Sequence, residues 1–312
     1  MNQRSGGIVA AIIALAMGSL PGCALIAQSS APSLSAPSVS ATDIRPPAPA
    51  SITAAPPGGD AGAQAGLATA YFTGRGLPQN FLLAAAWYYR AATQNNVTAQ
   101  LALATMYQAG QGVPATRAAA DYWYKQAAEQ GNAKAELALG DAYTNGTGVA
   151  VDNAKASHWY AAAAAQGVAA AQNSLGFNYN AGLGVPQNVQ KAAALFAAAA
   201  AQGYAKAEYN LGNYEYYGTG MPQSYSLAAT WWQRAANQGN EDAQDSLGNL
   251  YDLGQGVPQS HTRAAFWWQR AAVRANVKAQ FSLGAAYLTG NGVAMDPEKS
   301  AYWFMLAATP TP

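Results

Sequence analysis

The stretch Val97–Asn132, VTAQLALATMYQAGQGVPATRAAADYWYKQAAEQGN, decides how this chain folds. It holds a Gly-Gln-Gly-Val-Pro loop at 110–114 and an aromatic run at 122–124 with an Ala-Ala pair behind it. Both landmarks recur every thirty-six residues, without insertion or deletion, from residue 61 to residue 312. A fixed period of this length predicts repeated supersecondary units. The seven copies are 61–96, 97–132, 133–168, 169–204, 205–240, 241–276 and 277–312.

The first half of each copy has the apolar spacing of a helix that buries one face. In the second copy the pattern is Ala99, Leu103, Ala104 and Tyr107, spaced i, i+4, i+5 and i+8, which places all four on one side of an α-helix. The position of Ala104 is always Ala or Gly, and we expect it to let a neighbouring backbone approach closely. A glycine three residues after the aromatic suits a helix end in the left-handed region. Its seven copies are Gly74, Gly110, Gly146, Gly182, Gly218, Gly254 and Gly290.

The second half of each copy predicts another helix, and its start is marked by a capping residue. Side chains of Asn, Asp, Ser and Thr accept hydrogen bonds from the free amides of a first helical turn. Such residues stand six positions after each loop glycine, and an aromatic pair and an Ala-Ala pair follow. The seven expected caps are Asn80, Thr116, Asp152, Asn188, Ser224, Ser260 and Asp296.

One helical hairpin of this kind is not expected to fold alone. Ordering thirty-six residues costs roughly 50 kcal/mol at about 1.5 kcal/mol per residue. Burying one large aromatic side chain returns only about 5 kcal/mol. Each copy must therefore bury apolar side chains against both neighbours, as in repeat proteins. The fold class expected is an all-α solenoid of seven helix–turn–helix repeats.

The consensus of the copies resembles a known family. It reads Ala-Gln-x-x-Leu-Gly-x-x-Tyr-x-x-Gly-x-Gly-Val-Pro, then Ala-x-x-Trp-Tyr-x-x-Ala-Ala-x-Gln-Gly-Asn. This is similar to the Sel1-like repeat (SLR), a relative of the tetratricopeptide repeat, across all seven copies. The resemblance implies a right-handed α/α superhelix with a concave groove, and adaptor roles in envelope assemblies, polysaccharide export or host contact. A cysteine-rich branch of the family is linked to penicillin binding or weak β-lactam hydrolysis. That branch relies on one disulfide per repeat, and this chain has a single cysteine.

The N-terminus is expected to carry an export signal, residues 1–22. Arg4 precedes a ten-residue apolar run at 8–17, which is too short to span a bilayer. The sequence Leu20-Pro21-Gly22-Cys23 resembles the lipobox of bacterial lipoproteins, which implies lipidation of Cys23 after cleavage. An ordinary secretory signal is the alternative. Ala24 follows the cysteine where an acidic residue would imply inner-membrane retention, so we expect an outer-membrane lipoprotein facing the periplasm.

Residues 23–60 are expected to form a disordered tether. This segment is rich in Pro, Ser and Ala, including Pro46-Pro47 and Pro56-Pro57. Its apolar surface is too small to offset the entropy of ordering. We therefore interpret it as a spacer between the lipid anchor and the repeats, at 61–312.

Composition argues against nucleic-acid binding and against catalysis. Lys plus Arg number 16 against 15 Asp plus Glu, so no basic stripe exists to neutralise phosphates. The two histidines, His158 and His261, occupy different repeat positions, and no carboxylate pair recurs. We therefore expect no catalytic, cofactor or metal site, and the Gly-x-Gly loops lack the Lys-Ser or Lys-Thr of a phosphate-binding loop.

Recognition is expected where the repeats differ from one another. On the first helices of repeats four to six, three variable columns share one face. Aromatic side chains beside amides and carboxylates suit peptide or glycan recognition. The resulting candidate partner-binding residues are Phe177, Asn180, Tyr209, Asn213, Tyr216, Asp245, Asn249 and Asp252; the alternative is a merely solvated face.

These observations favour a lipid-anchored periplasmic adaptor or scaffold that organises an envelope protein assembly. The alternative is a peptidoglycan- or polysaccharide-binding module, and a β-lactam hydrolase is a third, less favoured reading. No polar capping helix follows the seventh repeat, although solenoid ends normally need one. We therefore expect an exposed apolar end near Phe304, Met305 and Leu306, available for self-association.

Overall fold

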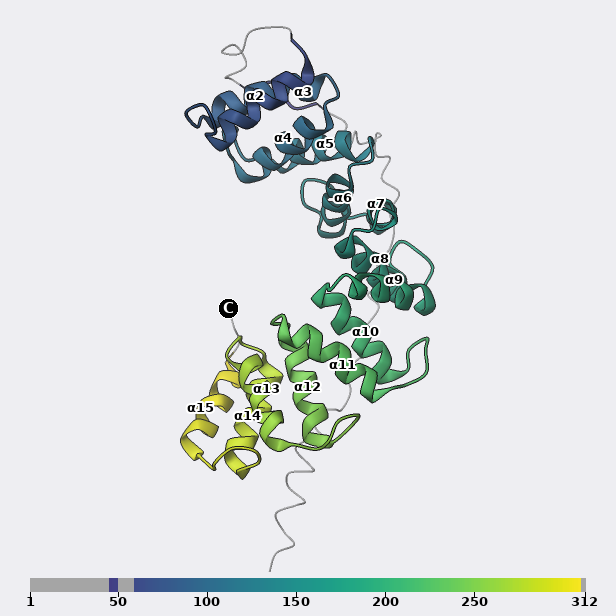
Figure 1. Cartoon of the computed structure of the whole chain (residues 1–312), viewed down its shortest axis with the longest axis vertical. Helices are drawn as coiled ribbons and strands as arrows, with labels where there is room; N and C mark the ends of the chain where they lie inside the picture. Colours follow the sequence, from purple (N-terminus) through teal and green to yellow (C-terminus); the bar gives the residue numbers. More distant parts are fainter. Residues whose placement is uncertain (1–44, 50–58, 310–312) are drawn as a thin grey trace, which may run out of the picture. The chain divides into compact units, whose positions relative to one another are not determined.

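The computed structural model describes residues 45–49 and 59–309, and this part of the chain forms an all-α solenoid of seven hairpins. Each hairpin has two helices, and each helix packs on those before and after it along the chain (Figure 1). The first helices are α2 (Ala61–Thr73), α4 (Val97–Ala109), α6 (Ala133–Asn145), α8 (Ala169–Ala181), α10 (Ala205–Tyr217), α12 (Glu241–Leu253) and α14 (Val277–Thr289). The second helices are α3 (Phe81–Thr93), α5 (Arg117–Ala128), α7 (Asn153–Ala165), α9 (Val189–Ala201), α11 (Tyr225–Asn237), α13 (His261–Ala272) and α15 (Pro297–Ala308).

The expected signal peptide at 1–22 and the lipidation site Cys23 lie outside the described residues. Within the ranges that are described, no helix combines the length and the apolar character needed to cross a bilayer.

The helix ends follow the expected signals with one exception. All seven first helices end at a loop glycine in the left-handed region, with φ between 67° at Gly146 and 76° at Gly290. Six of the seven expected caps accept a hydrogen bond from the third amide of the second helix. Thr116 does not, because its hydroxyl donates instead to the carbonyl of Pro114, at 3.1 Å.

The core runs through the stack along the expected columns. Leu103, Leu139 and Leu283 are fully buried, and none of the eight tryptophans is exposed. The small residue of the first helix has a different role from the one expected. A Cβ added at Gly212 would collide with the ring of Trp232 in the same hairpin, and not with a neighbouring backbone. The small residue therefore makes room for the second aromatic of its own repeat.

A column of mostly buried Gln and Glu side chains on the first helices makes hydrogen bonds within five of the hairpins and to the preceding repeat in several of them. The amide of Gln130, at the end of α5, donates to Oε1 of Gln100 in α4, at 2.7 Å. Gln100 in turn donates to the carbonyl of Ala92 in the preceding repeat, at 3.1 Å. The first of these bonds has counterparts in repeats one, three, four and five. Burying a polar atom costs free energy unless the atom is hydrogen-bonded, so these hydrogen bonds favour one register of each repeat against the next.

Residues 45–49, within the expected tether, lie against the repeats. Arg45–Pro49 has no regular secondary structure, but Pro46 and Pro49 are buried. Tyr89 donates to the carbonyl of Pro46, at 3.4 Å. Three prolines within five residues leave this short segment little backbone entropy to lose when it lies against the repeats. The disordered tether over 23–60 stays a prediction.

Candidate partner-binding surface

The eight candidate residues lie on α8, α10 and α12, but they do not form one open face. Phe177 on α8 is 53% exposed, whereas Asp245 on α12 is only 5% exposed. Asn249 is exposed, and the other five are partly buried. The expectation that Asp245 lies on the surface is therefore wrong: α12 packs between α11 and α13, and this column turns towards the stack.

Most of the eight residues make side-chain hydrogen bonds within the chain, and four of them bond to side chains outside the set. Tyr216 donates to Oε1 of Gln255, at 3.3 Å. Asn180 accepts from the hydroxyl of Tyr214, at 2.6 Å. Asn249 accepts from the indole N–H of Trp268, at 3.1 Å. Asp252 lies 2.8 Å from Nδ1 of His261. These side chains connect neighbouring helices and loops, which gives them a structural role that the variability of their columns did not reveal.

Tyr209 and Asp245 form the polar centre of the surface. Burial raises the pKa of Tyr209, and its hydrogen bond with Asn213 opposes the rise. Burial also raises the pKa of Asp245 to about 6, with the charge of Lys278 opposing it. One carboxylate oxygen of Asp245 accepts from Asn249, at 3.4 Å. The other, Oδ1, is buried without a hydrogen-bond partner.

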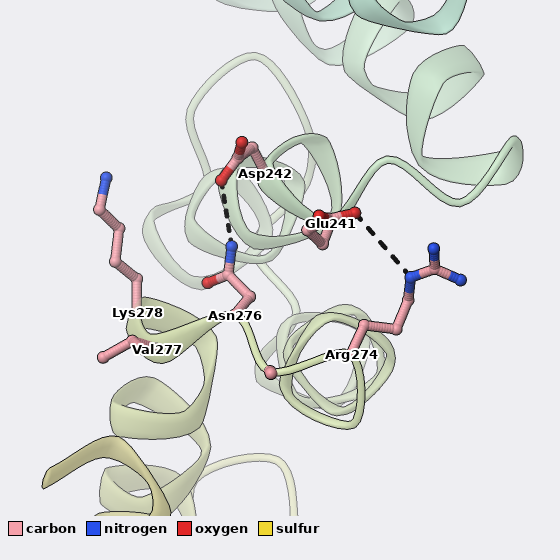
Figure 2. Close-up of a pocket in the computed structure, with 7 residues that line it drawn as sticks. Glu241, Asp242, Arg274, Asn276, Val277 and Lys278 are labelled. Carbon is pink, nitrogen blue, oxygen red and sulfur yellow. Dashed lines mark hydrogen bonds and ion pairs between the residues drawn. The ribbon is translucent and has the colours of Figure 1, made fainter. Parts of the chain in front are cut away.

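Two shallow hollows lie on either side of Glu241 and Asp242, at the start of α12. We name the two together the α12 rim. The first, of about 310 Å³, brings Tyr209 together with amides and one cation: it is lined by Asn173, Lys206, Tyr209, Asn210, Asn240, Glu241 and Asp242. The second, of about 320 Å³, is drawn in Figure 2 and is lined by Glu241, Asp242, Arg274, Ala275, Asn276, Val277 and Lys278.

The loop between α13 and α14 shapes the second hollow. Nε of Arg274 lies 3.9 Å from Glu241, and the amide of Asn276 donates to Asp242 at 3.1 Å (Figure 2). Between them Ala275 has φ 66°, in the left-handed region where equivalent positions in repeats two to five carry glycine. The pair Arg274-Ala275 thus replaces the Gln-Gly that ends most second helices. The residues of this hollow were not among those expected, although this break in the repeat is a sequence signal that could have located them.

The α12 rim offers hydrogen-bonding groups of both charges. Acidic side chains stand at its centre, and the exposed cations Lys206, Arg274 and Lys278 flank them. In the described ranges, no cluster of three or more His, Cys, Asp or Glu side chains has a geometry suited to a metal ion. These groups suit the recognition of a polar ligand through salt bridges, amides and one phenol.

The C-terminal hairpin exposes part of its apolar surface. Met305 on α15 is 58% exposed, while Phe304 and Leu306 are partly buried. Self-association through these residues stays a prediction.

Comparison with known proteins places the repeats in a family. A family model described as Sel1 repeat matches residues 61–96, 97–132, 133–168, 169–204, 205–240, 241–272 and 277–309. The chain is similar to the crystal structure of a protective antigen present in uropathogenic Escherichia coli strains, which displays an SLR fold. The TM-score is 0.73 and the identity 33%, over 80% of this chain. The aligned part spans about half, 53%, of that protein.

A second solved structure, a Sel1 repeat protein from Oxalobacter formigenes, is 35% identical with a TM-score of 0.67, covering 80% of this chain and 72% of the other. Among curated protein sequences, none matches this chain significantly.

Proposed function

Because the chain belongs to the Sel1 repeat family, we propose that it is an adaptor that holds a protein partner in an envelope assembly. Sel1 repeat proteins generally mediate protein–protein interactions, and the family is in general non-catalytic. The partner surface is the α12 rim, which includes Tyr209. A lipid on Cys23 anchors the chain to the outer membrane, and the repeats face the periplasm.

One observation carries the choice of surface: the α12 rim presents exposed charges of both signs that the stack does not use. Lys206, Asp242 and Lys278 are exposed along it, and none of the three forms a salt bridge within the part of the chain that the structure describes. A partner with complementary charges would pair with these side chains.

A charge reversal at the rim tests the adaptor role. Asp242 is exposed, so Asp242→Lys changes the charge of both hollows without disturbing the core. Glu298→Lys makes the same reversal at another exposed site, on α15, and is the matched control. Envelope proteins cross-linked to the wild-type chain should remain with Glu298→Lys and disappear with Asp242→Lys. An identical set of cross-linked proteins for all three chains would refute the assignment of the surface.

A peptidoglycan or exported polysaccharide is the second candidate ligand, and the amides of the first hollow favour it. Asn173, Asn210 and Asn240 surround the partly buried ring of Tyr209, and amides beside an aromatic face suit a sugar. Retention on purified sacculi that is lost with Tyr209→Ala, with no loss of cross-linked proteins, would select this candidate over the adaptor.

The membrane anchor is tested separately. Labelling with radioactive palmitate should mark the wild-type chain in the outer-membrane fraction and should not mark Cys23→Ser. An unlabelled wild-type chain would exclude lipidation and leave the ordinary secretory signal.

A further inference from the structure

The segment Arg45–Pro49 lies against repeats one and two through contacts that span long stretches of sequence. Tyr89 on α3 donates to the carbonyl of Pro46, at 3.4 Å. Tyr107 on α4 donates to the carbonyl of Pro47, also at 3.4 Å. Nε of Arg45 donates to the hydroxyl of Tyr122 on α5, at 3.2 Å. Three tyrosines from three helices therefore hold consecutive residues of one extended sequence, Arg-Pro-Pro-Ala-Pro.

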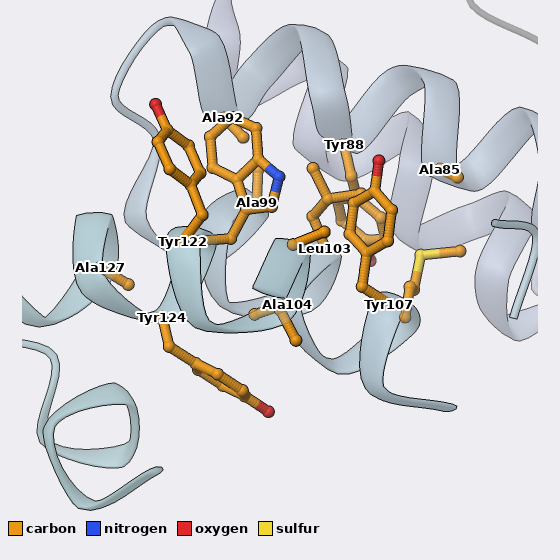
Figure 3. Packing of buried hydrophobic residues seen from close by; sticks show 14 of the residues in the cluster. Ala85, Tyr88, Ala92, Ala99, Leu103, Ala104, Tyr107, Tyr122, Tyr124 and Ala127 are labelled. Atoms are coloured by element: carbon orange, nitrogen blue, oxygen red, sulfur yellow. The ribbon is translucent and has the colours of Figure 1, made fainter. Parts of the chain in front are cut away.

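The surface beneath the segment is built from aromatic side chains that contact one another. Trp123 meets the ring of Tyr89 edge to face at 5.7 Å between centroids, and that of Tyr122 at 4.9 Å. Trp123 is 1% exposed, and its indole nitrogen has no hydrogen-bond partner. In Figure 3 the phenols of Tyr107 and Tyr122 extend to one side of the hairpin and that of Tyr124 to the other. We name Tyr89, Tyr107, Tyr122 and Trp123 the tyrosine groove.

The other repeats show how strongly the segment covers this groove. Tyr122 is 7% exposed, whereas the residues at the same repeat position in repeats six and seven, Phe266 and Tyr302, are 53% and 50% exposed. The position of Tyr122 is not intrinsically buried by the stack. Its burial in repeat two accompanies the hydrogen bond from Arg45 and the burial of Pro46 and Pro49.

The pair Tyr89 and Tyr122 also occurs at one junction alone. Later junctions carry, at the two equivalent positions, Lys125 with His158, Ala161 with Ala194, Ala197 with Thr230, Gln233 with Phe266, and Gln269 with Tyr302. Only the junction of repeats one and two supplies two phenols there. The groove is therefore a departure from the repeat and not a consequence of it.

The chemistry of the groove matches a proline-rich ligand. Proline has no N–H to donate, so a proline-rich strand offers carbonyl acceptors and flat apolar rings. Aromatic-lined grooves with hydroxyl or indole donors recognise such strands, whose fixed backbone limits the entropy lost on binding. The tyrosine groove supplies two hydroxyl donors at successive carbonyls and a phenol oxygen for the arginine. The guanidinium of Arg45 is charged at any working pH, and its hydrogen bond to Tyr122 is therefore charge-assisted.

We propose that the tyrosine groove is a binding site for proline-rich peptides of the Arg-Pro-Pro-x-Pro type, and that Arg45–Pro49 occupies it as an intramolecular ligand. Ten residues separate Pro49 from Asp60, the cap of α2. A link of this length keeps the segment at an effective concentration on the order of 1 mM. An external peptide with a dissociation constant of about 100 µM for the empty groove would therefore bind the occupied groove roughly 10-fold more weakly.

The test uses the full chain and a fluorescent peptide with the sequence of residues 42–50, TDIRPPAPA. Pro46→Ser/Pro47→Ser/Pro49→Ser empties the groove and leaves all seven repeats unaltered. By fluorescence anisotropy, this unblocked chain should bind the peptide saturably, and wild type should bind it about 10-fold more weakly. A peptide in which alanine replaces each proline should not bind.

Two conservative substitutions in the unblocked chain test the residues of the groove. Tyr122→Phe and Tyr89→Phe keep the rings and remove the hydroxyls, and each should weaken the peptide about 5- to 10-fold. Tyr302→Phe, at the position of Tyr122 in repeat seven, is the matched control and should have no effect. The proposal is overturned if the unblocked chain does not bind the peptide, if wild type binds it equally well, or if Tyr302→Phe weakens it as much as Tyr122→Phe.

Discussion

The most direct test of how the repeats stack is to substitute the second glycine of a loop with alanine. Gly112 has φ 71°, and its counterpart in repeat one, Gly76, has φ 78°. Both are in the left-handed region, where an alanine costs about 1–2 kcal/mol. Their surroundings differ. A Cβ on Gly76 would meet nothing, because no repeat precedes it, whereas a Cβ on Gly112 would collide with the carbonyl of Phe81 and approach the amide of Leu82.

The magnitude follows from these two contributions. Gly76→Ala should lower the free energy of unfolding by about 1–2 kcal/mol, from backbone conformation alone. Gly112→Ala meets backbone atoms that cannot rotate away, and overpacking adds about 1–3 kcal/mol. Its total cost should therefore be about 2–5 kcal/mol. Gly220, with φ 70°, is an interior control: its nearest contact would be a methyl group of Val189 at 3.3 Å, so its cost should lie between the two.

The assay is urea unfolding followed by circular dichroism, with hydrogen exchange to locate the change. Exchange in Gly112→Ala should accelerate at the start of α3 and the end of α4, because repeat stability depends on nearest-neighbour interfaces. Equal losses for Gly76→Ala and Gly112→Ala, within about 0.5 kcal/mol of each other, would refute the view that this glycine exists to let successive repeats touch.

Three further changes test individual residues of the stack. Burial raises the pKa of Asp121 to about 6 from 3.8, so its ionisation opposes folding. Asp121→Ala, which restores the residue of repeats one and four to seven, should therefore gain stability over wild type as the pH rises from 4 to 6, by up to about 3 kcal/mol above pH 6. Equal slopes of stability against pH for both chains would contradict this. Ala275→Gly should raise the stability by about 1 kcal/mol, because φ at this position is 66°, and an unchanged urea midpoint would argue against strain there. Arg234→Ala removes the ion pair at 2.8 Å to Glu208, whose side chain is 1% exposed, and should lower the free energy of unfolding by about 3 kcal/mol. Glu208→Gln introduces the residue found in most repeats and should cost under about 1 kcal/mol. Similar losses in both variants would refute the view that the unpaired buried charge causes the loss.

The helices, their ends and the stacking order were predictable because each repeats seven times. A column that is always Leu, such as that of Leu103, or always a capping residue, such as that of Asn80, indicates its environment without any tertiary information. Residues in the variable columns were harder to assign to the core or to the surface. Asp245 belongs to a variable column, yet it is buried, because variability shows only that repeats differ and not that solvent is near.

The tyrosine groove could not be predicted from periodicity at all. It joins Arg45 to Tyr122, seventy-seven residues apart, and the low-complexity composition around Pro46 pointed towards disorder. Composition predicts whether a segment can build its own core, but it is silent on whether the segment fits a surface built by other residues. Two features of the sequence together could have indicated the groove: two phenols at one junction, and an Arg-Pro-Pro-x-Pro sequence elsewhere. Neither feature indicates it alone.

The two surfaces follow from the same property of a repeat stack. Invariant columns such as that of Leu103 are committed to neighbouring repeats, so a mutation there spreads through an interface. Departures from the consensus, such as Tyr122 in repeat two and Arg274-Ala275 in repeat six, leave the stack intact and alter only the local surface. Recognition can therefore differ at each junction of one chain. A proline-peptide groove at repeats one and two and a charged rim at repeats four to seven are compatible. Each can be abolished without the other, as Tyr122→Phe and Asp242→Lys would show when assayed on both ligands.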